Sequence, residues 1–289
     1  MKKYFLLLTL LCLSLSARAH DAEVDGIFYN LDAANKTAAV TFKGDNYWDD
    51  DEYSGDVVIP ETVIYNGVTY SVTSLGDDCL AGCSSLTAIT IPNSVTSLGT
   101  GCFADCCSLE RMVVDAANPV YDSREDCNAI IHTSTNELIA GCKNSQIPNS
   151  VTSLGDHCFY GCSSLTAITI PNSVTSLGDY CFEGCSSLTS IYMIPSTPPI
   201  TGDGIFDDTP LETVYVVDVN AKRVYLAQEP WNYYAIVVMP TGIEELETDK
   251  TTPVIVGYYD LSGRPINGKQ RGAVILRYSD GSSRKVMVK

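Results

Sequence analysis

The sequence predicts a β-rich solenoid of short strands joined by helical or irregular turns, with a β cap before it and a small all-β domain after it. Three observations lead to this fold class. A unit of about 23 residues occurs four times. Within each unit, apolar residues alternate along a short run, which in two copies stops directly at a proline. Residues 253–289 lack this unit and hold three strand-like runs instead. Because one unit cannot bury its apolar face alone, successive units are expected to stack.

Residues 1–19 have the features of a secretory signal peptide. Two lysines precede the apolar run Tyr4–Leu15, and Ala17-Arg18-Ala19 forms a small-x-small cleavage site. We therefore expect cleavage after Ala19 and a protein that is secreted, extracellular or on the outer cell surface. A transmembrane anchor is disfavoured because the run is too short to span a bilayer, so no direct membrane span is expected. A lipid anchor at Cys12 is disfavoured because Leu11 before it is bulky.

Residues 20–70 are expected to form the N-terminal β cap, because they alternate in polarity but do not repeat. A solenoid needs such a cover, since its terminal repeat would otherwise expose the core. Asn66-Gly67, between two short apolar and aromatic runs, predicts a hairpin. The acidic run Asp49–Glu52 offers the clustered carboxylates of a calcium loop. It lacks the EF-hand spacing, so a solvated acidic turn is favoured.

The repeats predict a solenoid over residues 71–240. In the cleanest unit, NSVTSLGDHCFYGCSSLTAITIP, the spacing of Leu165, Ile168 and Ile170 is the L-x-x-L-x-L pattern of leucine-rich repeats, and alternation points these side chains inward. The register breaks once, at residues 115–147, which replace one regular unit by a longer one. We expect this irregular repeat to form a hairpin-like coil. It is a candidate for binding specificity, although simple tolerance to insertion also explains it.

Removal of residues 1–19 leaves eleven cysteines, and eight of them fall in two columns. The first column is Cys79, Cys102, Cys158 and Cys181, and the second is Cys83, Cys106, Cys162 and Cys185. Disulfides are feasible in an exported protein, but column mates in adjacent coils point the same way, which favours stacked thiols. If one bridge exists, Cys127 with Cys142 in the irregular repeat is the first candidate. No metal site is expected, because zinc needs four ligands that converge on one point.

The repeat I-x-I-P-x-S-V-T-S-L-G-x-x-C-F-x-G-C-S-S-L-T-x-I resembles the BspA-like leucine-rich repeats of bacterial surface proteins. The resemblance covers residues 55–240. The usual form has Ala where this chain has the first cysteine column, and Leu80 stands where the other copies have Phe. The resemblance implies an extended, curved solenoid on the cell surface. Some members of the family bind host matrix proteins or other bacteria, but no set of binding residues can be carried over.

The C-terminal runs resemble the sorting domain of the Bacteroidetes type IX secretion system. The resemblance rests on Y-D-L-S-G-R, a later Gly-x-x-Ile and a closing Lys-x-x-x-Lys. It implies a small β-sandwich over residues 253–289 that engages the export machinery and is then removed. The stretch 241–252 is expected to be a linker before it. The alternative is an ordinary β tail that caps the solenoid.

The charge of the chain restricts its partners. It carries 18 Lys and Arg against 35 Asp and Glu. Nucleic acid and anionic lipid both need basic surface, so neither is expected as a partner. Residues 20–241 carry 7 basic and 29 acidic residues, whereas residues 253–289 carry 7 and 2. This change of sign supports a separate C-terminal domain.

No catalytic constellation is found in the sequence, and we expect neither an enzyme nor a cofactor. The adjacent His157 and Cys158 do not suggest a nucleophile pair, because the cysteine is expected to point inward. The favoured function is a non-enzymatic, adhesin-like binding protein that recognises a host matrix protein, another bacterial surface or a glycan. The alternative is a structural spacer without a specific ligand. Threonine is also favourable on any β surface, so the outward strand positions have two explanations. These positions are Thr87, Thr90, Glu110, Arg111, Thr166, Thr169, Thr189 and Tyr192.

Overall fold

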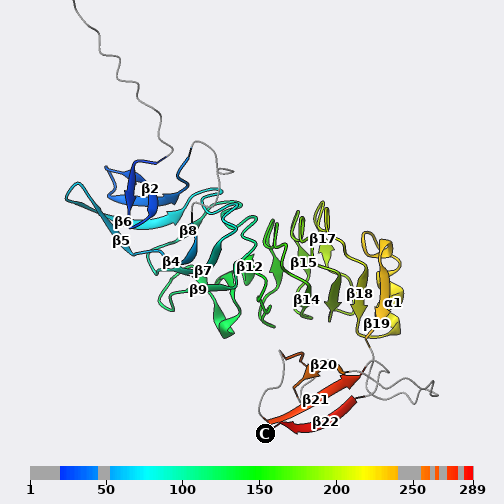
Figure 1. Ribbon diagram of the computed structural model, residues 1–289. Helices are drawn as coiled ribbons and strands as arrows, with labels where there is room; N and C mark the ends of the chain where they lie inside the picture. The colour runs from blue at the N-terminus through cyan, green and yellow to red at the C-terminus, as the bar shows by residue number, and fades with distance from the viewer. Residues whose placement is uncertain are drawn as a thin grey trace, which may run out of the picture. The chain divides into compact units, whose positions relative to one another are not determined.

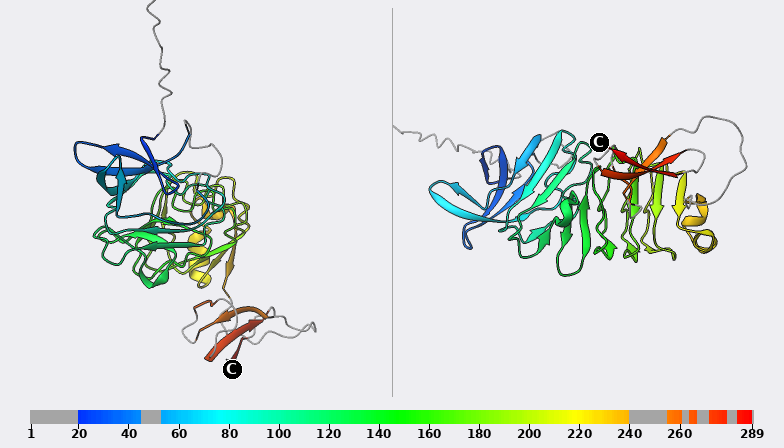
Figure 2. Two further views of the ribbon diagram at one scale, coloured as in Figure 1. Left: turned by 60° about the vertical axis from the view of Figure 1, so that its left-hand side comes forward. Right: turned by 90° about the horizontal axis from the view of Figure 1, so that it is seen from below.

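The computed structural model has two compact units, Met1–Val237 and Val238–Lys289. The described residues are 20–44, 53–239, 255–260, 264–266, 272–278 and 283–288. The predicted signal peptide (1–19), the acidic run Asp49–Glu52 and the predicted linker (241–252) lie outside them. Over the described residues the fold is rich in strands and has a single α-helix (Figure 1, Figure 2), which confirms the strand-rich class predicted from the repeats.

The N-terminal part of the first unit is a mixed sheet in the order β1-β2-β3-β6-β5, with β8 also paired to β6. Its strands are β1 (Ala22–Val24), β2 (Ile27–Asp32), β3 (Thr37–Thr41), β5 (Thr62–Tyr65), β6 (Val68–Leu75) and β8 (Ser97–Leu98). The predicted hairpin is confirmed, because β5 and β6 run antiparallel with Tyr65 opposite Val68. Asn66 and Gly67 between them have φ angles of 50° and 75°. Two left-handed residues are what a type I′ turn requires.

The repeats contribute strands that pair with the equivalent strands of the next repeat, in two sheets ordered β4-β7-β9 and β14-β16-β18-β19. The strands are β4 (Gly55–Val58), β7 (Leu86–Ile91), β9 (Arg111–Val114), β14 (Ala167–Ile170), β16 (Ser190–Met193), β18 (Thr213–Val216) and β19 (Ala235–Val238). From β4 to β9 and from β14 to β18 the pairing is parallel. The predicted cap, which ends at residue 70, includes β4, although β4 pairs with β7 of the repeats.

The core lies between these strands and the turns that close each repeat. Ile89 and Ile91 are fully buried while Thr90 between them is partly exposed, which confirms the predicted alternation. Phe182 stacks between the aromatic rings of the neighbouring repeats. Its centroid is 5.2 Å from that of Phe159 and 5.8 Å from that of Phe206, and both interplanar angles are 14°. The same slot in successive repeats is therefore a continuous aromatic column.

A second ladder includes the Ser-Leu-Gly segments of two regular repeats, at β13 and β15. It contains β10 (Tyr121–Asp122), β11 (Ala129–His132), β12 (Glu137–Gly141), β13 (Ser153–Leu154), β15 (Ser176–Leu177) and β17 (Ile200–Thr201). Its coils approach closely at the glycine: a Cβ on Gly178 would lie 2.5 Å from the backbone nitrogen of Asp156. The Asp156 carboxylate accepts a hydrogen bond from the Asp179 N–H at 2.9 Å, and Asp179 accepts one from the Asp203 N–H at 2.8 Å. Glycine thus permits the approach, and the aspartates bridge it.

The irregular repeat, residues 115–147, contains the predicted hairpin as β11 and β12, preceded by a short 3-10 turn, η1 (Arg124–Asp126). Strand β12 joins the second ladder by pairing in parallel with β13. On the turn side, however, the two flanking regular repeats bond directly to each other. The Asp105 N–H donates to the Tyr160 carbonyl at 3.2 Å, as the Gly161 N–H donates to the Glu183 carbonyl at 2.8 Å one repeat later. The irregular repeat therefore adds no turn between Asp105 and Tyr160, although its Gly141 N–H donates to the Cys158 carbonyl at 2.7 Å.

The cysteines of the described residues are all free thiols, and ten of the eleven are buried. The bridge between Cys127 and Cys142, the first candidate from the sequence, is not formed. The antiparallel register places Ala129 opposite Gly141, which sets Asn128 rather than Cys127 opposite Cys142. Each thiol donates to a backbone carbonyl instead, Cys127 to Ala129 at 3.5 Å and Cys142 to Asn128 at 3.3 Å.

The last repeat of the first unit is followed by α1 (Val219–Tyr225) and a 3-10 turn, η2 (Trp231–Tyr233). The Asp218 carboxylate caps α1 by accepting a hydrogen bond from the Ala221 N–H at 2.8 Å. Trp231 is buried and packs edge-on against the Phe206 ring. In the second unit, β20 (Ile255–Tyr259), β21 (Gly272–Tyr278) and β22 (Ser283–Val288) form an antiparallel sheet at the three runs that the sequence predicted as strand-like.

Candidate binding surface

The strands β14, β16 and β18 present two outward rows of side chains, separated by rows that are buried. Parallel strands about 4.8 Å apart keep equivalent residues in line, so one position of the repeat becomes one row on the surface. The outward rows are Ala167, Ser190 and Thr213, and Thr169, Tyr192 and Tyr215. The second row carries two of the predicted ligand-facing residues.

Tyr192 and Tyr215 stack on adjacent strands. Their ring centroids are 4.8 Å apart with an interplanar angle of 11°, and both side chains are partly exposed. A stacked aromatic pair contributes about 0.5–1.5 kcal/mol beyond its buried area, so the two rings hold each other in place. Tyr215 was not among the predicted positions. The spacing of Leu211, Val214 and Val216 places it in the same slot as Tyr192, so the sequence contained the signal.

Two of the predicted positions at β7 and β9 contact neighbouring side chains. Thr87 donates its hydroxyl hydrogen to the Asp56 carboxylate at 2.8 Å. Glu110, just before β9, forms an ion pair with Lys143 of the irregular repeat, at 2.6 Å. Arg111 is exposed. The Glu110–Lys143 ion pair links the irregular repeat to the regular coil beside it.

The eight predicted positions therefore divide into two sets on two separately hydrogen-bonded sheets. Thr87, Thr90, Glu110 and Arg111 belong to the set at β7 and β9. Thr166, Thr169, Thr189 and Tyr192 belong to the set at β14 and β16. The Thr189 N–H donates to the Thr166 carbonyl at 3.2 Å, which continues the ladder just before the two strands. The irregular repeat lies between the two sets in the chain.

A polar network fixes the irregular repeat. The Arg124 guanidinium pairs with Asp122 at 2.5 Å and donates to the Asn136 side-chain oxygen at 2.8 Å. The Thr133 hydroxyl donates to the same Asp122 carboxylate at 2.9 Å. Burial raises the pKa of Asp122, but the hydrogen bonds from Arg124 and Thr133 outweigh it and hold the pKa below its ordinary value.

The substitution Asp122→Asn is expected to weaken the protein at neutral pH and to remove part of its acid sensitivity. A carboxylate with a lowered pKa in the folded state stabilises the fold above its ordinary pKa, and this contribution is lost as the pH falls through the folded value. Both side chains are 26% exposed, so solvent screening limits the effect to about 1 kcal/mol. Urea unfolding at neutral pH and near pH 3 measures it. Glu125→Gln, an exposed neighbour, serves as the control, and an equal loss in both variants at neutral pH would argue against the network.

Acidic side chains gather along the turns of successive repeats. Burial is the main cause that raises the pKa values of Asp78, Asp105 and Glu183 above their ordinary value, and Asp77 adds to the effect on Asp78. The imidazole of His157 acts in the opposite direction on Asp78 and Glu183.

His157 and Cys158 are not arranged as a catalytic base and its nucleophile. The His157 ring lies against the rings of Tyr160 and Tyr180, at 5.5 and 5.3 Å between centroids. The Cys158 sulfur instead contacts Cys181, and burial raises its pKa well above the ordinary value. A thiol reacts as the thiolate, so this environment disfavours attack on a substrate. Within the described ranges, no group of three or more His, Cys, Asp or Glu side chains is arranged to hold a metal ion.

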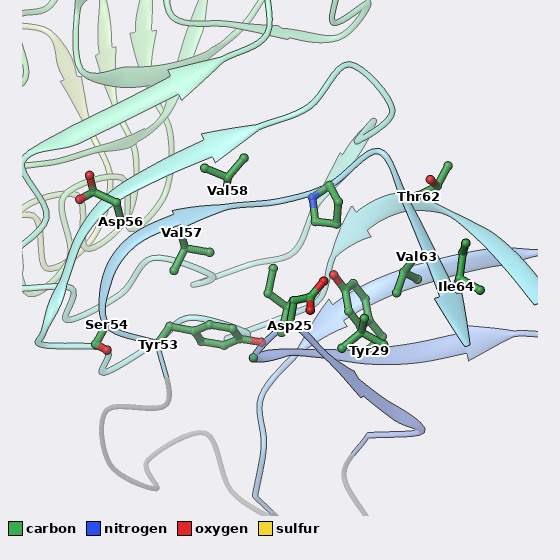
Figure 3. Close-up of a pocket in the computed structure, with 14 residues that line it drawn as sticks. Asp25, Tyr29, Tyr53, Ser54, Asp56, Val57, Val58, Thr62, Val63 and Ile64 are labelled. Atoms are coloured by element: carbon green, nitrogen blue, oxygen red, sulfur yellow. The ribbon is translucent and has the colours of Figure 1, made fainter. Parts of the chain in front are cut away.

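An open cavity of about 720 Å³ lies in the N-terminal part of the first unit, between the β1–β2 turn and strands β4 and β5 (Figure 3). Asp25 lies beside Tyr29, and burial together with this carboxylate raises the pKa of the phenol to about 12. The exposed side chains of Val58 and Ile64 border the same cavity. It lies where the N-terminal sheet meets β4, the first strand of the repeat sheet.

The parallel ladders and the repeated core positions define a leucine-rich repeat protein. The family model of the BspA-type leucine-rich repeat region matches residues 63–124 and 129–224 in six copies, so the chain belongs to that family. This membership is consistent with a non-enzymatic binding or surface role and points to no enzymatic family. No curated protein matches the chain. Among the helices in the described ranges, none has the length and apolar character needed to cross a membrane.

Solved leucine-rich repeat structures are similar to the chain at low identity. A leucine-rich repeat protein of T. pallidum is 20% identical, with 68% of this chain and 71% of that chain covered and a TM-score of 0.33. A leucine-rich cell surface protein of Faecalibacterium prausnitzii A2-165 is 20% identical, with 68% and 54% covered and a TM-score of 0.35. A leucine-rich repeat protein of Bacteroides ovatus is 18% identical, with 68% and 71% covered and a TM-score of 0.34.

Proposed function

We propose that this protein is a secreted or cell-surface, non-enzymatic binding protein that recognises a macromolecule through the outward faces of its repeat strands. The partner is a host matrix protein, another bacterial surface or a glycan. The observation that carries the proposal is the outward row of Thr169, Tyr192 and Tyr215, in which two tyrosine rings are held in a stack. Tyrosine offers a large contact area and a hydrogen-bonding hydroxyl at low entropic cost, which suits a recognition surface.

The irregular repeat provides the second part of the proposed surface. It breaks the regular pattern of the rows and is held in place by the Lys143–Glu110 ion pair and the Arg124 network. A site whose side chains are fixed before binding loses less entropy when the partner arrives. This repeat is also where the chain differs most from its own regular pattern, so it is a natural source of specificity.

The proposed location rests on the ends of the sequence and on the family. The signal-like residues 1–19 support export with cleavage after Ala19. Residues 253–289, with their resemblance to a type IX sorting domain, support contact with the export machinery. Membership of a family known from bacterial surface proteins agrees with both. The mass of the protein recovered from the culture medium tests the two cleavages directly.

Binding is expected to depend on the two stacked tyrosines. The exported protein is titrated against immobilised matrix proteins, whole bacterial cells and a glycan array. For any surface that shows saturable binding, the double substitution Tyr192→Ser and Tyr215→Ser should weaken the affinity roughly tenfold or more, because aromatic residues at the centre of an interface dominate its energy. Tyr233→Ser is the matched control, since this tyrosine is 66% exposed but lies on η2, outside the strand face.

Replacement of residues 115–147 by one regular repeat is the second arm of this experiment. It should abolish binding if the irregular repeat supplies specificity. Unchanged affinity would restrict the surface to the strand rows. The absence of saturable binding to any of these surfaces would contradict the binding function and favour the alternative, a structural spacer or surface-matrix component.

A further inference from the structure

Two cysteines of the first column are in direct contact. The sulfur atoms of Cys158 and Cys181 are 3.3 Å apart, although 23 residues separate them in the chain. The sequence suggested that column mates would be poor disulfide partners, because they point the same way. In the stacked coils that common direction is what brings the two sulfurs together.

The backbone around this pair has the spacing that a disulfide needs. The His157 N–H donates to the Asp179 carbonyl at 2.9 Å, and the Phe159 N–H donates to the Cys181 carbonyl at 2.9 Å. These bonds on both sides of Cys158 hold the two coils like neighbouring strands, which are about 4.8 Å apart. Disulfide-linked residues have Cα atoms about 4.4–6.8 Å apart, so the bond can close with little backbone movement.

The second column is arranged differently. There, the Cys185 thiol donates to the Phe159 carbonyl at 3.1 Å, and the Cys106 thiol donates to the Leu80 carbonyl at 3.1 Å. Cys162 follows the same pattern with a longer contact, 3.7 Å, to the Gly141 carbonyl. These thiols are aimed at backbone oxygens of the adjacent coil rather than at each other. The two columns therefore differ in what their sulfur atoms face.

We propose that Cys158 and Cys181 become a covalent cross-link between adjacent coils in the exported protein, whereas Cys162 and Cys185 remain thiols. The inference rests on the proposed export, which brings the chain to an oxidising environment. The oxidant is an external disulfide, either a small molecule or an oxidoreductase. One cysteine thiolate attacks it and releases one external thiol, and the second cysteine attacks the resulting mixed disulfide and releases the other. Two protein thiols are oxidised, one external disulfide is reduced, and the two protons pass to the released thiolates.

Burial sets the order of events. Cys158 is 3% exposed and Cys181 is fully buried, so an external disulfide cannot reach them in the packed coil. The exchange must occur before the coil closes, and the finished bond is then shielded from reductants. In the native protein the cross-link should resist reduction until the coil unfolds.

The test uses the full chain, reduced and unfolded, and then refolded in a mixture of reduced and oxidised glutathione. Alkylation under denaturing conditions without reductant should leave two cysteines unmodified, compared with none in the reduced control. Proteolysis before aspartate and after aromatic residues places the two cysteines of each coil on different peptides. Cleavage after Phe159 separates Cys158 from Cys162, and cleavage after Phe182 separates Cys181 from Cys185. The linked peptides should contain Cys158 and Cys181.

Two variants and a second sample decide between outcomes. Cys158→Ser should lose the linked peptides, and Cys162→Ser, from the same coil, should keep them. Complete alkylation after refolding, or linked peptides that contain Cys162, would overturn the cross-link itself. A bridge after refolding that is missing from protein collected from the medium would overturn its formation in the exported protein. Absence of the protein from the medium would instead overturn the export on which the inference rests.

Discussion

The substitution Phe182→Ala is expected to lower the free energy of unfolding by about 4 kcal/mol, the upper range for a large side chain removed from a packed core. Phe182 is fully buried, and its ring stacks between Phe159 and Phe206 of the adjacent repeats. Alanine would leave a cavity between two rings that cannot collapse toward each other, because the ladders on both sides fix the distance between coils. Guanidinium unfolding followed by circular dichroism measures the loss.

The matched control is Phe182→Leu. The first repeat already has a leucine in this slot, Leu80, which is fully buried. Leucine fills most of the space, so the loss should be about 1 kcal/mol. A loss below about 1 kcal/mol for alanine would mean that the aromatic column is not a packed core. Equal losses for alanine and leucine would show that ring stacking, rather than filled volume, holds the repeats together.

The substitution Gly178→Ala is expected to destabilise the protein by about 3 kcal/mol through contact between coils. A Cβ there would lie 2.5 Å from both the backbone nitrogen and the carboxylate of Asp156, and 2.6 Å from the carbonyl carbon of Gly155. Two of these three atoms belong to the backbone and cannot rotate away. The coils would have to separate, and the hydrogen bond between Asp156 and the Asp179 N–H would lengthen.

Gly67→Ala isolates the cost of backbone conformation from the cost of contact. Gly67 lies in the β5–β6 turn with a φ of 75°, and a Cβ on it would meet no atom within 4 Å. Its substitution should cost about 1 kcal/mol, the usual penalty for a left-handed position. If Gly178→Ala costs no more than Gly67→Ala in the same unfolding experiment, the coils do not approach as closely as described.

Much of the repeat architecture could be predicted because stacking imposes the same requirements on every copy. The inward positions, such as Ile89 and Ile91, are apolar in each unit, and the spacing alone identifies them. The hairpin at Asn66-Gly67 follows from local backbone preference. The sequence also indicates that β4 belongs to the repeats, because Val57-Val58-Ile59-Pro60 ends at a proline, as two of the regular units do. The predicted boundary at residue 70 instead assigned β4 to the cap.

The candidate surface was only partly predictable, because it depends on contacts between distant residues. Alternation indicates that Glu110 faces outward, but not that Lys143 of the irregular repeat pairs with it. The sequence also places Cys158 and Cys181 in one column without indicating that their sulfurs meet. Such contacts depend on how far one coil is displaced relative to the next. The repeat period does not determine this displacement.

The hydrogen bond from the Asp105 N–H to the Tyr160 carbonyl bears on where insertions and deletions can occur in such a protein. The turns of the repeats on either side of residues 115–147 meet directly at Asp105 and Tyr160, so a change in the length of this segment outside β12 leaves that contact in place. An insertion elsewhere would have to preserve both ladders and the aromatic column at once. Insertions and deletions within residues 115–147 should therefore destabilise the fold least. We expect related proteins to differ in length most in this segment.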